Sequence, residues 1–236
     1  MRKGILIVIS GFSGAGKGTL VKELLKKYDN YCLSVSATTR APRQGEKEGR
    51  EYFFLSREEF ENKIEKDDFI EYASYLGNYY GTPKEYVLRH LNKGENVILE
   101  IEIQGAAKIK EKFKDALMVF VAPPSAEILE SRLVGRDTES REQIKNRLLR
   151  AADESSFVKD YDYIIVNDVL NEAVKKLNCL IECRGMEVSE NLGFIERLRY
   201  ELKHLNGHGS MESFYRVGSL YHGLGHRYLY DCHADG

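Results

Sequence analysis

The glycine-rich segment at residues 11–19, GFSGAGKGT, constrains the fold of this chain more than any other feature. It fits the pattern G-x-x-x-x-G-K, with Gly11, Gly16 and Lys17 in register, and it follows the aliphatic run at residues 5–9. In such a loop the glycines allow a tight turn, backbone amides converge on phosphate oxygens, and the lysine neutralises the outer phosphates. The helix that follows adds its positively polarised N-terminus.

The context of this loop separates a phosphate site from an ordinary turn. A glycine-rich strand-to-helix turn with a solvated lysine is the alternative. The loop lies, however, between an aliphatic strand and the amphipathic segment at residues 20–25, which is the arrangement that supports phosphate binding. We therefore predict that a nucleotide phosphate chain binds to Gly11, Phe12, Ser13, Gly14, Ala15, Gly16, Lys17, Gly18 and Thr19.

One position in the loop bears on metal binding. GTPases and many ATPases place a Ser or Thr hydroxyl directly after the lysine as a Mg²⁺ ligand. Here that residue is Gly18, and Thr19 follows one position later. We expect no direct metal ligand from the protein: Mg²⁺ is held by nucleotide phosphates and water, with Glu100 or Glu102 in an outer shell.

Composition excludes several classes of protein. With 42% hydrophobic and 31% charged residues, the 236-residue chain can bury one core, or a core with an inserted lobe. A formal net charge of −2 gives no overall attraction to nucleic acid or anionic lipid. The longest aliphatic run falls far short of the roughly 20 residues that a membrane span requires. We predict a cytoplasmic protein without nucleic-acid or membrane partners.

The four cysteines, Cys32, Cys179, Cys183 and Cys232, are irregularly spaced and form no C-x-x-C pair. Neither a disulfide framework nor a zinc cluster is suggested by this spacing. Packing is therefore expected to hold the fold together.

Strand-like and helix-like segments alternate along much of the chain. Short apolar, largely β-branched runs occur at residues 5–10, 96–103, 117–122 and 163–166, with amphipathic segments between them. This alternation predicts an α/β P-loop fold of three layers, in which a parallel sheet is flanked by helices.

Helix starts are marked by hydroxyl residues with Glu or Gln three positions later. These capping-box patterns are Ser56 with Glu59, Thr82 with Glu85 after Pro83, and Ser140 with Gln143. Gly94 fits the end of the helix that Pro83 opens.

The pattern changes at residues 36–91, which we interpret as an inserted lobe. Residues 40–50 are polar and contain Pro42, Gly45 and Gly49, and aromatic strand-like pieces follow at 52–55 and 69–75. The predicted organisation is a P-loop core at 1–35 and 92–185, a lobe at 36–91, and an extension at 186–236 whose role the sequence does not reveal.

The extension contains five of the six histidines. Residues 190–205 predict a helix through Leu192, Ile195, Leu198, Leu202 and Leu205. His222, His226 and His233 with Cys232 suggest a metal, but their spacing matches no zinc template. The favoured interpretations are a lineage-specific extension or a partly disordered segment that binds a partner.

Several motifs together resemble the guanylate kinase family, from about residue 3 to residue 183. They are the phosphate loop, SVSATTRAPRQGEKEGREYFF at 34–54, FIEYASYLGNYYGTP at 69–83, ILEIEIQGA at 98–106, FVAPPS at 120–125, RLVGRDTES at 132–140 and IVND at 165–168. The resemblance implies a Mg²⁺-dependent transfer of the γ-phosphate of ATP to GMP, giving ADP and GDP. It makes ATP and GMP the expected partners and residues 36–91 a GMP-binding lobe.

Guanine recognition follows from the resemblance and from chemistry. Guanine presents the N1–H and N2–H donors beside the O6 acceptor, so a carboxylate and a hydroxyl can select it over adenine. The resemblance assigns the carboxylate to Glu71, which from the sequence alone is more typical of a solvated strand position, and the hydroxyls to Ser36 and Thr82. Glu100 and Glu102 complete the expected guanine side, although the family more often has Asp where Glu102 stands.

The resemblance also assigns the cationic residues. Arg40 and Arg43 suit a bidentate grip on the GMP phosphate, and Tyr52 and Tyr80 add phenol groups. A lid at about residues 132–150 is expected to close over the ATP phosphates. It contains Arg132, Arg136 and Arg147, and Asn167, which follows the lid in sequence, is the expected adenine contact. The expected catalytic residues are Lys17, Arg40, Arg136 and Arg147. Asp137 stands where the family usually has Gly and adds a negative charge beside the lid arginine.

Phosphoryl transfer of this kind needs positioning and positive charge rather than a strong base. One alternative is a non-catalytic guanylate-kinase-like module that binds proteins, against which the intact Lys17 loop argues. Another is a P-loop GTPase, but the sequence has no N-K-x-D motif for guanine.

Overall fold

The computed structural model describes residues 3–43, 45–75, 77–135 and 140–205. The chain divides into two compact units, one at Lys3–Met186 and the other beginning at Glu187. All of the described residues from the predicted site lie in the first unit. Arg136 and Asp137 lie outside the described residues.

A five-stranded parallel sheet forms the centre of the first unit, in the order β2-β7-β1-β8-β9. The strands are β1 (Leu6–Gly11), β2 (Tyr31–Leu33), β7 (Asn96–Glu100), β8 (Leu117–Ala122) and β9 (Tyr163–Val166). The predicted parallel sheet is therefore confirmed. The predicted strand at 96–103 was too long, because its last residue already belongs to the helix α4 (Ile103–Lys112), for which Glu102 is the N-cap.

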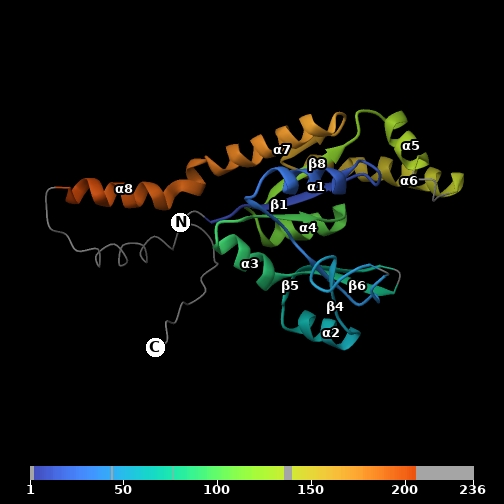
Figure 1. Cartoon of the computed structure of the whole chain (residues 1–236), viewed down its shortest axis with the longest axis horizontal. Helices are drawn as coiled ribbons and strands as arrows, with labels where there is room; N and C mark the ends of the chain where they lie inside the picture. The colour runs from blue at the N-terminus through green and yellow to red at the C-terminus, as the bar shows by residue number, and fades with distance from the viewer. Residues whose placement is uncertain (1–2, 44, 76, 136–139, 206–236) are drawn as a thin grey trace. The chain divides into compact units, whose positions relative to one another are not determined.

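Helices cover both faces of this sheet (Figure 1). Alternate residues of β1 enter different cores: Ile7 and Ile9 pack in the cluster with helices α1 (Lys17–Lys27) and α7 (Leu170–Gly185), and Leu6 and Val8 in the cluster with α3 (Lys84–Asn92) and α4. Because side chains alternate along a strand, a strand covered on both faces must be apolar throughout. This is why the aliphatic run of β1 predicts a buried central strand.

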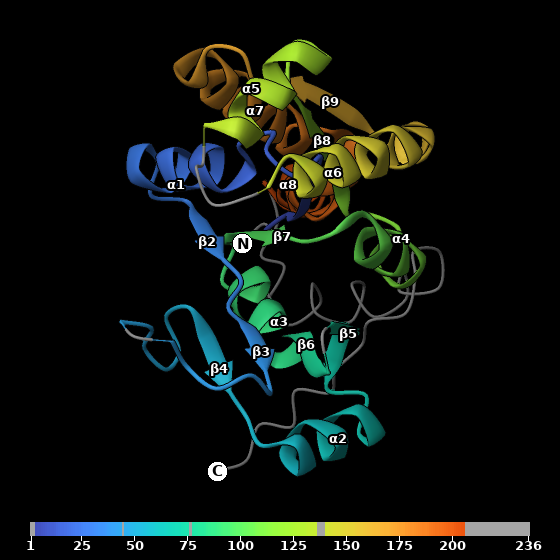
Figure 2. The ribbon, with the colours of Figure 1, turned by 90° about the vertical axis from the view of Figure 1, so that its right-hand side faces the viewer.

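A second, four-stranded sheet has the order β4-β3-β6-β5 (Figure 2). Its strands are β3 (Ser36–Thr38), β4 (Tyr52–Phe54), β5 (Phe69–Tyr75) and β6 (Asn78–Pro83). The helix α2 (Arg57–Glu65) buries Phe60 against Phe69 and Ala37 of this sheet. The aromatic segments that predicted strands at 52–55 and 69–75 thus form part of one small core.

Two of the three predicted capping boxes are present. Ser56 with Glu59 caps α2, and Ser140 with Gln143 caps α6 (Arg141–Glu154). The third prediction, Thr82 with Glu85, was wrong: Pro83 is the N-cap of α3, and no side chain caps that helix. Thr82 lies in β6, where its hydroxyl donates to Glu71 instead.

The end of α3 is as predicted. The helix ends at Asn92, and Gly94 follows with a φ of 83°, a left-handed conformation that favours glycine.

The helices α5 (Ala126–Val134) and α6 pack together through a small apolar cluster that includes Leu129, Leu133 and Ile144. The half-buried Phe12 of the glycine-rich loop also packs against this cluster. Short 3₁₀ turns at Ser155–Asp160 and Val188–Asn191 complete the described elements of the chain.

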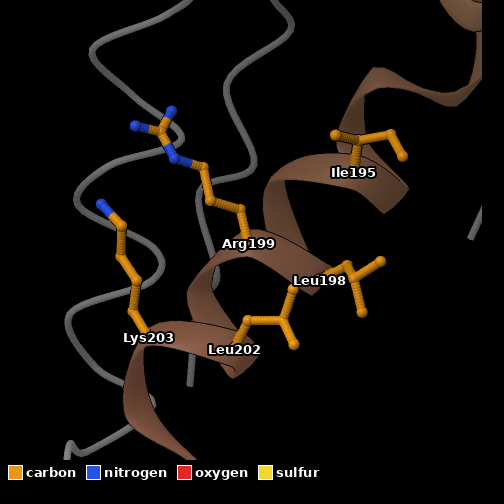
Figure 3. Close-up of a pocket in the computed structure, with 5 residues that line it drawn as sticks. All are labelled: Ile195, Leu198, Arg199, Leu202 and Lys203. Carbon is orange, nitrogen blue, oxygen red and sulfur yellow. The ribbon is translucent and has the colours of Figure 1, made fainter.

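In the second unit, the predicted helix is confirmed as α8 (Leu192–His204). Ile195, Leu198 and Leu202 follow one another along this helix, with Arg199 and Lys203 beside them, and these five residues line a pocket (Figure 3). None of the predicted site residues contributes to that pocket.

Among the described residues, no helix is both long and apolar enough to cross a membrane.

Candidate active site

The loop between β1 and α1 has the backbone that phosphate binding requires. Gly11 and Gly16 have positive φ angles of 152° and 87°. A Cβ atom at Gly11 would lie 2.1 Å from the carbonyl oxygen of Val121, and one at Gly16 would lie 2.5 Å from Nδ2 of Asn167. Gly11 is therefore fixed by packing against backbone as well as by conformation, whereas at Gly16 the close atom belongs to a side chain and the left-handed φ is the main constraint.

The ammonium group of Lys17 lies over this loop. Its Nζ donates to the carbonyl oxygens of Gly11 at 2.6 Å and Phe12 at 3.1 Å. Lys17 is also the first residue of α1, so the positive charge and the helix N-terminus coincide. This arrangement can bind the phosphates of a nucleotide.

Three residues that are distant in sequence converge on the same loop. The side-chain amide of Asn167 donates through Nδ2 to the carbonyl oxygen of Ala15 at 2.9 Å. The guanidinium of Arg132 donates through NH2 to the backbone carbonyl oxygen of Asn167 at 2.8 Å. Arg147 NH1 donates to Ser13 Oγ at 2.8 Å. The described cationic residues predicted for ATP, together with Asn167, therefore lie at the phosphate loop.

The two predicted acidic residues at and just after the end of β7, Glu100 and Glu102, occupy different surroundings. A Cβ atom at Gly18 would lie 3.5 Å from Oε1 of Glu100, so this carboxylate lies beside the start of α1. Glu100 is accessible to solvent, but restricted hydration of its carboxylate raises the pKa, and the nearby Lys17 acts in the opposite direction. Glu102 is exposed and accepts from Arg150 NH2 at 3.3 Å.

A buried acid–hydroxyl pair lies between β5 and β6. Oε1 of Glu71 accepts a hydrogen bond from Thr82 Oγ1 at 2.8 Å, and its other oxygen lies 3.4 Å from where a Cβ atom of Gly105 would be. Glu71 is half-buried and Thr82 is buried. Desolvation raises the pKa of Glu71, and the Thr82 hydrogen bond and Lys108 partly oppose that rise.

An arginine–tyrosine cluster lies on the same small sheet. The Arg40 guanidinium is 5.4 Å from the centre of the Tyr52 ring, and the Tyr52 and Tyr80 ring centres are 6.0 Å apart. The pKa of Arg40 is raised mainly by its hydrogen bond to Glu46, and Tyr80 adds a smaller contribution. Tyr80 and Thr82 are two residues apart on β6 and so share one face of the strand. The cluster and the Glu71–Thr82 pair therefore lie on one side of this sheet.

Two other residues predicted for the acceptor side have fewer contacts. Arg43 is exposed, and its backbone N–H donates to Glu46 Oε2 at 2.7 Å. Ser36 is half-buried at the start of β3, opposite Tyr52 in the β3–β4 register.

Glu46 is a residue that the sequence analysis did not identify. Both of its carboxylate oxygens accept from Arg40 NH2, at 2.9 Å and 3.0 Å, in addition to the bond from the Arg43 backbone. These bonds hold the pKa of Glu46 below its usual range, the Arg43 N–H having the largest effect. The regular spacing of Arg40, Arg43 and Glu46 in a polar segment was the signal that could have indicated it.

A parallel sheet with helices on both faces and a lysine-bearing glycine loop at the carboxyl end of β1 define a P-loop kinase-like fold. A family model of guanylate kinases matches residues 3–184. The chain therefore belongs to the guanylate kinase family, as its motifs predicted.

Curated relatives and a solved structure agree with this assignment. Guanylate kinase from Clostridium tetani is 49% identical over 195 residues, covering 81% of this chain and 93% of the relative. Guanylate kinase from Clostridioides difficile is 48% identical over 203 residues, covering 86% of this chain and 99% of the relative. The crystal structure of guanylate kinase from Anaplasma phagocytophilum aligns with a TM-score of 0.62 at 35% identity, over 79% of this chain and 88% of that one.

Proposed function

We propose that this chain is an ATP:GMP phosphotransferase, which transfers the γ-phosphate of ATP to GMP and releases ADP and GDP. The observation that carries the proposal is the presence, in one compact unit, of a lysine-bearing phosphate loop and a separate acid–hydroxyl pair beside an arginine–tyrosine cluster. The family membership of the chain and its curated relatives support the same activity.

On the donor side, Lys17 and the amides of residues 11–19 bind the ATP phosphates. Arg132 and Arg147 reach the loop from α5 and α6, and by resemblance Arg136 joins them in a lid at about 132–150. Positive charge placed around the migrating phosphoryl group stabilises the charge that develops on its oxygens. Asn167 lies beside the loop, where the resemblance puts an adenine contact.

Gly18 at the start of α1 and the Glu100 carboxylate beside it, at the end of β7, fit a Mg²⁺ ion bound through water. Gly18 offers no hydroxyl ligand, and the Glu100 carboxylate lies close enough to it to accept hydrogen bonds from metal-bound water. Bound Mg²⁺ neutralises phosphate charge and orients the phosphate chain. Glu100 therefore belongs with the donor site in this proposal, in an outer shell.

On the acceptor side, ionised Glu71 accepts the N1–H and N2–H bonds of guanine, and the Ser36 and Thr82 hydroxyls complete the recognition. Adenine has no hydrogen on N1, so the guanine-facing positions of the Glu71 carboxylate would stay unpaired beside its bond from Thr82, at a cost of about 1–3 kcal/mol or more. Glu102 is the second acid that the resemblance places near guanine. Arg40, Arg43, Tyr52 and Tyr80 hold the GMP phosphate.

Arg40 can bind phosphate without losing Glu46. Glu46 occupies one terminal nitrogen of the guanidinium, and NH1 donates to the Ala41 carbonyl oxygen at 2.7 Å. A guanidinium has five N–H donors, so others remain for phosphate oxygens. Closure of the 36–91 lobe and the lid would exclude water and protect ATP from hydrolysis.

An acceptor panel tests the proposal. Purified protein with ATP and Mg²⁺ is offered GMP, dGMP, AMP, UMP and CMP, and the diphosphate products are identified. We expect strong preference for GMP and loss of transfer in Lys17→Met, with Lys22→Met on the exposed face of α1 as a matched control. Absence of transfer to every acceptor would favour the protein-binding alternative, and rapid GTP hydrolysis without an acceptor would favour a GTPase.

A further inference from the structure

Three potential metal ligands meet outside the proposed active site. The sulfur of Cys32 on β2, an imidazole nitrogen of His90 on α3 and a carboxylate oxygen of Glu95 all lie within 4.8 Å of one another. All three residues are partly buried. No described residue of the phosphate loop or the acceptor site belongs to this group.

The position of this group in the fold is specific. The chain passes from the parallel sheet to the small sheet between β2 and β3, and it returns through α3 to β7. Cys32 lies on β2, the strand from which the chain leaves the parallel sheet, whereas His90 and Glu95 lie on the segment through which it returns. The three ligands therefore join the outgoing strand to the returning segment.

The backbone already holds these residues in place. Cys32 pairs with Val97 in the parallel sheet, and the Glu95 N–H donates to the His90 carbonyl oxygen at 3.1 Å. The His90 imidazole and the Glu95 carboxylate are hydrogen-bonded, and Cys32 Sγ lies 3.3 Å from the Tyr86 hydroxyl.

One thiolate, one imidazole and one carboxylate form a donor set that suits Zn²⁺. Tetrahedral bonds of about 2.0–2.3 Å place neighbouring ligand atoms about 3.3–3.8 Å apart. The three ligand atoms lie within 4.8 Å of one another, which exceeds that spacing by at most about 1–1.5 Å. Three protein ligands leave a fourth position for water.

We propose that Cys32, His90 and Glu95 bind a thiophilic divalent cation, best matched by Zn²⁺, at the junction of the two sheets. Binding releases the thiol proton to solvent, and His90 binds as the neutral imidazole, whose one proton is on the ring nitrogen that does not face the metal. Cys32 and His90 are 58 positions apart, so no short cysteine–histidine template could have indicated this site.

The test uses the full chain, stripped of metal with a chelator and then dialysed against Zn²⁺. Bound zinc is measured per chain, and Co²⁺ is added separately because thiolate ligation of Co²⁺ gives a charge-transfer absorption band. We expect Cys32→Ser and His90→Asn each to lose about one equivalent of zinc relative to the unmodified protein. Cys32→Ser should also lose the thiolate band. Far-ultraviolet circular dichroism of the metal-free variants checks that they are folded.

Other cysteines and histidines of the chain require matched controls. Cys179 and Cys183 are exposed on α7, and Cys232 lies near several histidines in sequence. The double variant Cys179→Ser with Cys183→Ser, and the variant Cys232→Ser, should keep both the zinc and the band. Unchanged zinc and cobalt binding in folded Cys32→Ser, or loss of the band only in a control variant, would overturn the proposal.

Discussion

Single carboxylates decide the chemistry of the proposed acceptor site. Glu71 is half-buried against Thr82, and Glu46 orders Arg40 and the backbone of Arg43. The two acids differ in effect because Glu71 would bind the guanine base, whereas Glu46 would hold in place Arg40, which binds the GMP phosphate. Each leads to a distinct kinetic signature.

For Glu71, the expected signature is a pH dependence. Burial raises its pKa, and only the ionised carboxylate can accept both guanine N–H bonds. The KM for GMP should therefore rise as pH falls through this raised pKa. The raised pKa lies above the ordinary glutamate value of about 4.3. Thr82→Val removes a bond that lowers the pKa and should move the rise to still higher pH.

The measurement is the KM for GMP across the acidic range, at saturating ATP. Glu71→Gln cannot ionise, so the same rise should be missing from that variant. An identical acidic rise in unmodified protein and in Glu71→Gln would assign the titration to another group.

For Glu46, we expect an effect on GMP binding rather than on chemistry. Glu46→Gln weakens the charge-assisted bonds to Arg40, and the KM for GMP should rise by about tenfold with a smaller change in kcat. Glu61→Gln, which removes an exposed ion pair with Arg57, is the matched control and should change neither. An unchanged KM in Glu46→Gln would leave Glu46 without a positioning role.

At the scale of elements, the α5–α6 pair brings cations to the phosphate loop. Phe12 of the loop packs against the cluster of these two helices, and Arg147 of α6 donates to Ser13. The helices therefore hold these arginines at the phosphate loop, and in the proposed function this is where charge develops during transfer.

Arg147→Met should consequently lower kcat by about 100-fold or more while the KM for GMP changes little. Lys145→Met, at an exposed position of the same helix, serves as the control and should retain activity. Steady-state kinetics with ATP and GMP varied separately distinguish these effects. A normal kcat in Arg147→Met would contradict a transition-state role for this residue.

Much of the element arrangement could be predicted, since it depends on local patterns. The buried strands, two capping boxes and the end of α3 follow from aliphatic runs, side-chain hydrogen bonds and Gly94. Thr82 was misassigned because a tertiary partner, Glu71, competes for its hydroxyl. Glu46 was missed because its regular spacing from Arg40 and Arg43 was a weak signal, and its bonds to Arg40 depend on the folded position of that side chain.

At the scale of the whole molecule, the described residues of the proposed site lie within Lys3–Met186, and the family match ends at residue 184. A chain that ends at Met186 should therefore keep the kcat and both KM values within about twofold. Kinetics of the shortened and full chains compare these values directly. A shortened chain that stays folded and monodisperse but loses transfer would mean that residues after 186 contribute to the site.

The central claim is that one half-buried carboxylate on the small sheet selects the acceptor base while a separate loop binds the donor phosphates. The most direct measurement is the ratio of kcat/KM for GMP to kcat/KM for AMP, in unmodified protein and in Glu71→Gln. We predict a large ratio that falls by about 100-fold in the variant, mainly through GMP. An unchanged ratio in a folded Glu71→Gln protein would contradict the account.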